Sequence, residues 1–120
     1  MNLKKKKTSF NDGVCGVYLE KKLINDFNAK INAKTIDDYD FIINLFYSIE
    51  NIREEDFEFA ERIGKKLTMK IKTPLTDVVE SKHKIIINDK VYDIIKKDPD
   101  IRNKDLYLYL EGGRKLEKQN

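Results

Sequence analysis

The strongest constraint on the fold is a strict two-residue alternation in the C-terminal half of the chain. Residues 66–73 place Leu67, Met69 and Ile71 on one side and polar residues between them. Residues 106–111 repeat the pattern with three leucines separated by tyrosines. Successive side chains of a β-strand point to opposite faces, so each segment predicts a half-buried antiparallel strand.

Shorter apolar runs predict further strands, and one acidic segment predicts a helix. We expect strands over residues 14–19, 42–52, 84–88 and 91–96. Asn88-Asp89-Lys90 suits the tight turn of a hairpin, because Asn and Asp tolerate positive φ. The helix is expected after Arg53, where three acidic residues complement a helix N-terminus, and it should end at Gly64.

Turn-forming and polar residues predict where these elements end. Pro74 should end the strand before it, and Asp98-Pro99-Asp100 should interrupt regular secondary structure. Gly112-Gly113 should lie past the last strand. Residues 20–40 are polar and poorly periodic, which predicts a long loop that is either functional or disordered. A second loop is expected over 74–82.

Together these elements predict a mainly β fold, a small antiparallel β-barrel of five or six strands with one short helix and a long loop in its N-terminal half. Closure of the barrel would hide the edges of Ile-rich strands. The 120 residues suffice for one domain. We predict a flexible arm over 1–13, the barrel domain over 14–111 and a flexible tail over 112–120.

The charges are unevenly distributed although the net charge is only +3. Residues 37–61 contain nine acids against the single base Arg53, whereas Lys4–Lys7 form a basic N-terminal run. Four lysines at 65, 66, 70 and 72 follow the acidic segment. Such opposite-signed segments are solvated surfaces, or they pair between subunits of a ring. No apolar run approaches the roughly 18 residues of a membrane span.

Few residues suggest catalytic chemistry. Cys15 and His83 are the single cysteine and histidine, and they offer a possible nucleophile and base. Cys15 lies in an apolar strand, where a buried, inert thiol is the ordinary case, and it has no cysteine to form a disulfide with. The sequence contains no CxxC or HxxxH motif that could bind zinc and no EF-hand loop that could bind calcium. It also has no glycine-rich phosphate-binding loop before a helix. We predict a non-enzymatic protein with no catalytic residue, cofactor or metal.

The alternative function is an OB-like module that binds single-stranded nucleic acid. The strand at 66–73 places Lys66, Thr68, Lys70 and Lys72 on one face, and the last strand places Tyr107 and Tyr109 on one face. Lysines with aromatic platforms are typical of single-strand binding. The same residues also suit a solvated sheet and a subunit contact, and the acidic helix segment would weaken attraction to phosphates.

The order of elements over residues 45–111 resembles the head-closure, or head–tail joining, proteins of tailed bacteriophages. The residues that carry the resemblance are Leu45-Phe46-Tyr47-Ser48-Ile49, the polar segment Arg53 to Ala60, the alternating strand Leu67 to Lys72, the hairpin Lys84 to Ile94 with its Val91-Tyr92-Asp93-Ile94, Asp100-Ile101-Arg102, and Leu106 to Glu111. Their succession, rather than one motif, is similar to the family.

The resemblance implies a structural role in the virion. Family members form a homo-oligomeric ring below the portal, retain the packaged DNA and join the tail. The implied partners are the portal or adaptor ring and the tail-completion protein, with DNA passing through the channel without sequence-specific binding and no membrane contact. The implied location is the neck of the virion, after synthesis in the cytoplasm of a bacterial host.

Two loops are the candidate interface or channel segments. The first is the long loop, from which we expect Asn25, Asp26, Phe27, Lys30 and Lys34 to face the channel or a ring partner. The second is the loop over 74–82, from which we expect Asp77, Val78, Val79 and Glu80 to dock on a neighbour. Valines exposed on a loop are unfavourable unless another protein covers them.

Overall fold

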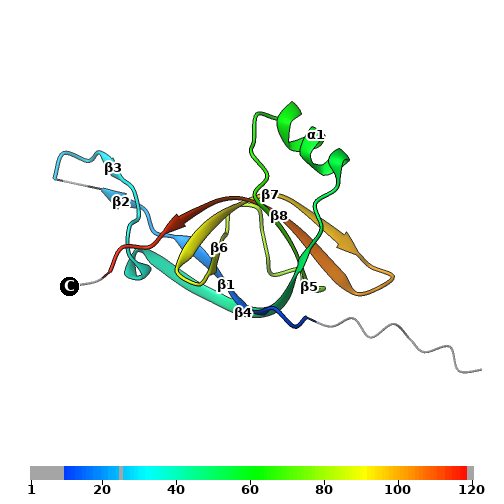
Figure 1. Cartoon of the computed structure of the whole chain (residues 1–120). Coiled ribbons are helices and arrows are strands. Elements are labelled where there is room, and N and C mark those ends of the chain that lie inside the picture. The colour runs from blue at the N-terminus through cyan, green and yellow to red at the C-terminus, as the bar shows by residue number, and fades with distance from the viewer. Residues whose placement is uncertain (1–9, 25, 119–120) are drawn as a thin grey trace, which may run out of the picture.

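Six antiparallel strands close into a barrel in the computed structural model, which describes residues 10–24 and 26–118 (Figure 1). Their order around the barrel is β1-β4-β5-β8-β7-β6, and β6 pairs back onto β1. The strands are β1 Gly13–Glu20, β4 Tyr39–Glu50, β5 Met69–Pro74, β6 Lys84–Ile87, β7 Lys90–Asp100 and β8 Asp105–Lys115. The predicted mainly β fold with one short α-helix is confirmed.

Most of the alternating residues fill the barrel as the sequence pattern predicts. Leu67 is the exception, because β5 begins only at Met69 and Leu67 is buried with Ala60 of the helix that follows β4. Ile71, Leu108 and Leu110 are completely buried in one apolar cluster. Cys15 and Val17 of β1 and Ile85 of β6 join them. Two positive-φ residues, Asn88 and Asp89, make the tight turn between β6 and β7. The core therefore follows directly from period-two patterning.

The hairpin of β7 and β8 is longer at both ends than the sequence predicts. Pro99 was expected to interrupt the strand, but it lies within β7 and is paired with Leu106 of β8. β6 pairs with β7 only as far as Asp93, so beyond that residue β7 is paired on one edge, with β8. A proline is tolerated there because its missing N–H can face the unpaired edge. The hairpin therefore extends out of the barrel (Figure 1).

Gly112 and Gly113 belong to β8, although the predicted tail began there. Both have positive φ, 105° and 112°. Gly113 lies at a register shift opposite Val91 and Tyr92, and a Cβ on it would approach the Tyr92 ring to 3.2 Å. A bulge glycine lets the strand continue to Lys115. Most of the predicted N-terminal arm lies outside the described residues, although Asp12 donates from its N–H to Tyr47 O at 3.0 Å.

Residues 20–40, which were predicted to form a long loop, contain regular secondary structure instead. A small hairpin of β2 Leu23–Ile24 and β3 Lys30–Ile31 is followed by the 3₁₀ helix η1 Ile36–Asp38. β4 then begins at Tyr39, earlier than predicted. Two-residue strands are too short to produce a detectable alternation. The hairpin projects away from one end of the barrel (Figure 1).

The single α-helix, α1 Glu54–Arg62, packs against the outside of the barrel. Ala60 is buried there in a cluster with Leu67 and Tyr109. Gly64 adopts φ 71° just after the helix, as predicted. None of the helices over residues 10–24 and 26–118 is long and apolar enough to cross a membrane.

The cross-strand partners Ile49 and Ile71 provide a matched test of the barrel core. Ile71 is fully buried, whereas Ile49 is 54% exposed. We expect Ile71→Ala to lower the free energy of unfolding by about 3 kcal/mol, because it leaves a cavity, and Ile49→Ala to lower it by less than about 1 kcal/mol. Urea denaturation followed by circular dichroism measures both; equal losses would contradict a core centred on β5 and β8.

Candidate functional site

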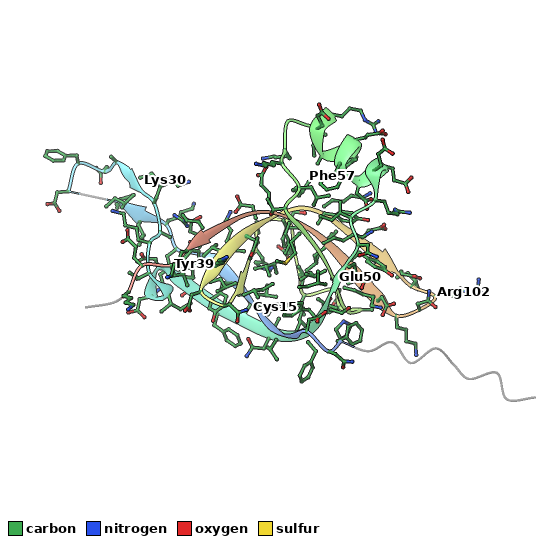
Figure 2. All side chains as sticks on the ribbon, in the orientation of Figure 1. Cys15, Lys30, Tyr39, Glu50, Phe57 and Arg102 are labelled. Carbon is green, nitrogen blue, oxygen red and sulfur yellow. The ribbon has the colours of Figure 1, made fainter. Side chains whose placement is uncertain are left out.

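The hairpin arm, residues 21–24 and 26–34, carries most of the predicted interface residues of the first loop. Asp26, Phe27, Lys30 and Lys34 are all exposed, and Phe27 reaches 89% exposure. Figure 2 shows Lys30 on this arm, outside the barrel. The remaining predicted residue, Asn25, lies outside the described residues.

The base of the arm is held by polar contacts to the barrel. Arg114 of β8 donates from Nη1 to Ala33 O at 2.8 Å and from Nη2 to Tyr39 Oη at 2.6 Å. The Lys34 N–H donates to Asp38 Oδ2 at 2.8 Å. Ala33 itself is buried. The arm therefore leaves the barrel from a fixed point, and Arg114 is a residue that sequence reasoning had assigned to a tail.

The loop between β5 and β6 has a buried centre, which corrects one of the predicted interface residues. Val79 is completely buried in the barrel core, and Lys97 Nζ donates to its carbonyl oxygen at 2.9 Å. It is therefore not available to a partner. Asp77, Val78 and Glu80 are exposed around it.

A groove of about 500 Å³ separates this loop from the β7–β8 hairpin. Its lining is mainly apolar and includes Leu75, Pro99, Ile101 and Leu106. Ile101 is 69% exposed at the tip of the hairpin. Asp77 and Lys97 provide the charged rim. The groove is thus suited to an apolar side chain of another protein.

The two predicted segments lie apart, since the hairpin arm and the β7–β8 tip project from different ends of the barrel (Figure 1). The structure does not bring them into one site. It offers two separate surfaces, one projecting and one hollow.

A third exposed apolar surface lies on the outside of β1 and β4. Val14 pairs with Phe46, and Tyr18 pairs with Phe41 across the two strands. Phe46 is 63% exposed and Phe41 is 55% exposed. Phe46 stands between Leu45 and Tyr47 in a segment predicted as a strand, so period-two alternation places its side chain on the face opposite theirs. The sequence signal for this surface therefore existed, but the sequence analysis did not use it.

α1 covers the centre of the lysine-bearing face on which the nucleic-acid alternative depends, whereas Lys66 and Thr68 stay exposed. Lys70 was expected to point into solvent, but it is buried and its Nζ lies 3.2 Å from Asp56 Oδ2. The same ammonium lies 5.0 Å from the centroid of the Tyr109 ring and 5.4 Å from that of Tyr107. Lys72 lies 4.0 Å from Glu50. Neither lysine is free to bind phosphate, and Tyr109 is not an open stacking platform.

Asp56 joins the helix to the barrel through one carboxylate oxygen, Oδ2. Oδ2 accepts hydrogen bonds from the Arg53 N–H at 3.0 Å and from Lys70 Nζ at 3.2 Å. Burial by itself would raise the pKa of Asp56, but hydrogen bonds from Arg53 and Lys70 outweigh it and hold the pKa below 3.8. The carboxylate is therefore structural in this position.

Asp105 has the opposite environment. It is 4% exposed, and its Oδ1 is the one buried side-chain oxygen or nitrogen without a hydrogen-bond partner among residues 10–24 and 26–118. Burial raises the pKa of this carboxyl, and nearby Asp100 and Glu50 raise it further against the attraction of Lys72. No group of three histidines, cysteines or acids that could hold a metal gathers within the described part of the chain.

Cys15 and His83 do not form the arrangement that nucleophilic catalysis requires. Burial raises the pKa of the Cys15 thiol to about 12, so it stays protonated near neutral pH. The His83 Nδ1 accepts the Glu80 N–H at 3.0 Å and so helps to hold the β5–β6 loop.

Comparison with known proteins adds information about the fold. No family model matches the chain, and no curated protein matches it. The solution structure of protein SF1141 from Shigella flexneri 2a, a structural-genomics target, is similar with a TM-score of 0.59. The two sequences are 12% identical, and the match covers 84% of this chain and 91% of the other. Such a likeness shows a shared fold only.

The buried pair of Asp56 and Lys70 should be far more important for stability than an exposed pair. We expect Asp56→Ala to lower the free energy of unfolding by about 3–5 kcal/mol, because it leaves the Lys70 ammonium buried without a partner. Glu80→Ala breaks the exposed pair with Lys82 and should cost less than about 1 kcal/mol. Urea denaturation at neutral pH compares the two. Because the folded pKa of Asp56 is lowered, its contribution is present above pH 3.8 and disappears as the pH falls through the folded value.

Asp105→Asn should stabilise the protein at neutral pH. The folded pKa of Asp105 is raised, so the wild type loses stability as the pH rises from the unfolded pKa through the folded pKa. The amide removes that buried charge, and we expect a gain of roughly 1 kcal/mol at pH 7 that vanishes near pH 3. Urea denaturation at both pH values is the measurement, with Asp98→Asn as control, because Asp98 is exposed and forms no ion pair with a described residue. A loss at pH 7 would show that the Asp105 carboxylate is stabilised in the fold.

Proposed function

We propose that this chain is a structural subunit of the head–tail connector of a tailed bacteriophage. It assembles as a ring below the portal, helps to retain packaged DNA and joins the tail without catalysing a reaction. The succession of segments over residues 45–111 supports this function by its resemblance to head-closure proteins. Location in the virion neck, after synthesis in the cytoplasm of the host, belongs to the same proposal.

The observation that carries the proposal is the amount of apolar surface that the closed barrel leaves outside. Phe27 on the hairpin arm, Phe46 on β4 and Ile101 on the β7–β8 tip are each more than half exposed. They lie on three different surfaces of one small domain. Large apolar patches on a soluble domain mark contacts with other proteins, and a subunit of a multi-component ring has several neighbours.

The separate surfaces suit different kinds of partner. The projecting hairpin arm is suited to reach a neighbouring subunit or the channel, as expected from the position of its residues in the sequence. The groove beside Leu75 and Ile101 is suited to another virion protein, which is the portal or adaptor ring on one side or the tail-completion protein on the other. DNA then passes the ring without contacts to particular bases.

The structure disfavours the particular surface on which the nucleic-acid alternative was based. Lys70 is buried beneath α1, and Tyr109 is 4% exposed. Tight single-strand binding needs free cations and accessible aromatic rings. The connector function therefore remains the better explanation of the exposed residues.

Loss of the chain from infected cells tests the proposed function. Without this chain the neck is incomplete, so we expect filled heads that leak DNA and do not join tails. Tails should still assemble normally. Electron microscopy and nuclease sensitivity of the packaged DNA measure both effects. Heads that retain DNA and join tails without the chain would contradict the proposal, and so would wild-type binding to single-stranded DNA that weakens steeply with salt.

A shortened hairpin arm tests whether the arm itself contributes to head–tail joining. The variant must keep Tyr39, because this residue is buried and accepts a hydrogen bond from Arg114. Replacing residues 24–30 by a two-residue turn keeps the anchors at Ala33 and Tyr39. We expect this variant to fold like the wild type by circular dichroism but to restore head–tail joining poorly. Lys66→Glu, an exposed lysine in the connection between α1 and β5 and outside both the arm and the groove, serves as a surface control that should restore it fully.

A further inference from the structure

The hairpin arm combines exposed apolar side chains with an excess of positive charge. Ile24 is 62% exposed, and Phe27 at the turn is 89% exposed. Four lysines, at positions 21, 22, 30 and 34, stand against one acid, Asp26. Lys21 lies 3.8 Å from Asp40, whereas Lys22, Lys30 and Lys34 form no ion pair with any residue that the structure describes.

The outer face of α1 has the complementary chemistry. Helical periodicity places Glu54, Phe57, Glu58 and Glu61 on the side opposite Asp56, which is buried against the barrel. Phe57 is 49% exposed, three residues after Glu54 and four before Glu61, so it borders the three carboxylates. None of the three forms an ion pair within the described part of the chain. The acidic helix face is therefore an exposed phenyl ring beside three carboxylates that form no ion pair with described residues.

We propose that the hairpin arm of one copy of this chain docks on the acidic helix face of the next copy. The inference rests on the proposed ring function and names the contact that would build the ring. The lysines of the arm would lie against Glu54, Glu58 and Glu61, and Phe27 would pack near Phe57. Electrostatic complementarity of this kind fixes partner and register, while the aromatic pair supplies buried area.

The positions of the two surfaces make the contact intermolecular. Lys30 on the arm and Phe57 on the helix lie well apart in Figure 2, so they do not meet within one copy. Two different patches that meet head to tail build a ring when the rotation between neighbours closes. The β7–β8 tip is a poorer acceptor, because its Arg102 and Lys104 would repel the lysines of the arm.

Charge reversal on each surface, followed by mixing, tests the contact. The arm variant combines Lys22→Glu, Lys30→Glu and Lys34→Glu, and the helix variant combines Glu54→Lys, Glu58→Lys and Glu61→Lys. Sedimentation equilibrium at low salt should show that the wild type self-associates and that either variant alone associates at least about tenfold more weakly. An equimolar mixture of the two variants should recover association, because opposite charges face each other again.

Controls separate this contact from a general effect of charge or of unfolding. Arg102→Glu, at the far hairpin tip, should self-associate like the wild type, and circular dichroism should be the same for all variants. The proposal is overturned if the wild type stays monomeric at about 1 mM, if the variants associate like the wild type, or if mixing them fails to restore association.

The same variants distinguish this contact from the connector function itself. If charge-reversed subunits join heads to tails as the wild type does, the arm-to-helix contact is wrong and the connector function stands. If the contact is measured in solution but loss of the chain leaves heads and tails normal, the connector function is wrong and the contact stands.

Discussion

The short antiparallel ladder between β1 and β6 is the interaction on which the rest of this structure depends. It pairs Gly16 with Ile86, Val17 with Ile85 and Tyr18 with Lys84. These few residues turn a curved six-stranded sheet into a closed barrel, which leaves no unpaired edge along this seam. Closure also encloses Cys15, Val17 and Ile85 in one core with the leucines of β8.

Once the barrel is closed, its outer surface divides into covered and uncovered parts. α1 covers the face of β5 and β8, where Asp56 and Lys70 form a buried ion pair beside two tyrosines. A buried ion pair is weak support for stability by itself, but it strongly disfavours any arrangement in which one partner is left alone. The pair therefore fixes the helix on this face and directs its acidic side outward.

The uncovered parts are the basis of the proposal that this chain acts through protein contacts. The potential nucleophile Cys15 is a protonated core residue, and His83 accepts a backbone hydrogen bond. In contrast, exposed phenylalanines occur on the arm, on β4 and on α1. A small barrel with a projecting basic arm and an acidic helix face has the features of a subunit that is completed by its neighbours.

Local patterning determined much of the fold. Alternation in residues 66–73 and 106–111 predicted two central strands and their buried residues, and the acidic start and Gly64 predicted α1. These signals are local, because a strand or helix imposes its own period on the side chains. The polar, poorly periodic composition of residues 20–40 led to Phe27 and Lys30 as interface candidates; both are exposed, and their role as a partner contact stays a proposal.

Only the tertiary structure decided the features that depend on distant segments. Val79 was predicted to be exposed because it lies in a loop, but the barrel buries it; Lys70 was predicted to face solvent, but α1 covers it. Pro99 and the two glycines of β8 continue strands because a paired neighbour on one side and a bulge make room for them. Which residues remain exposed is set by what packs over them, and that information is not contained in the period of any single segment.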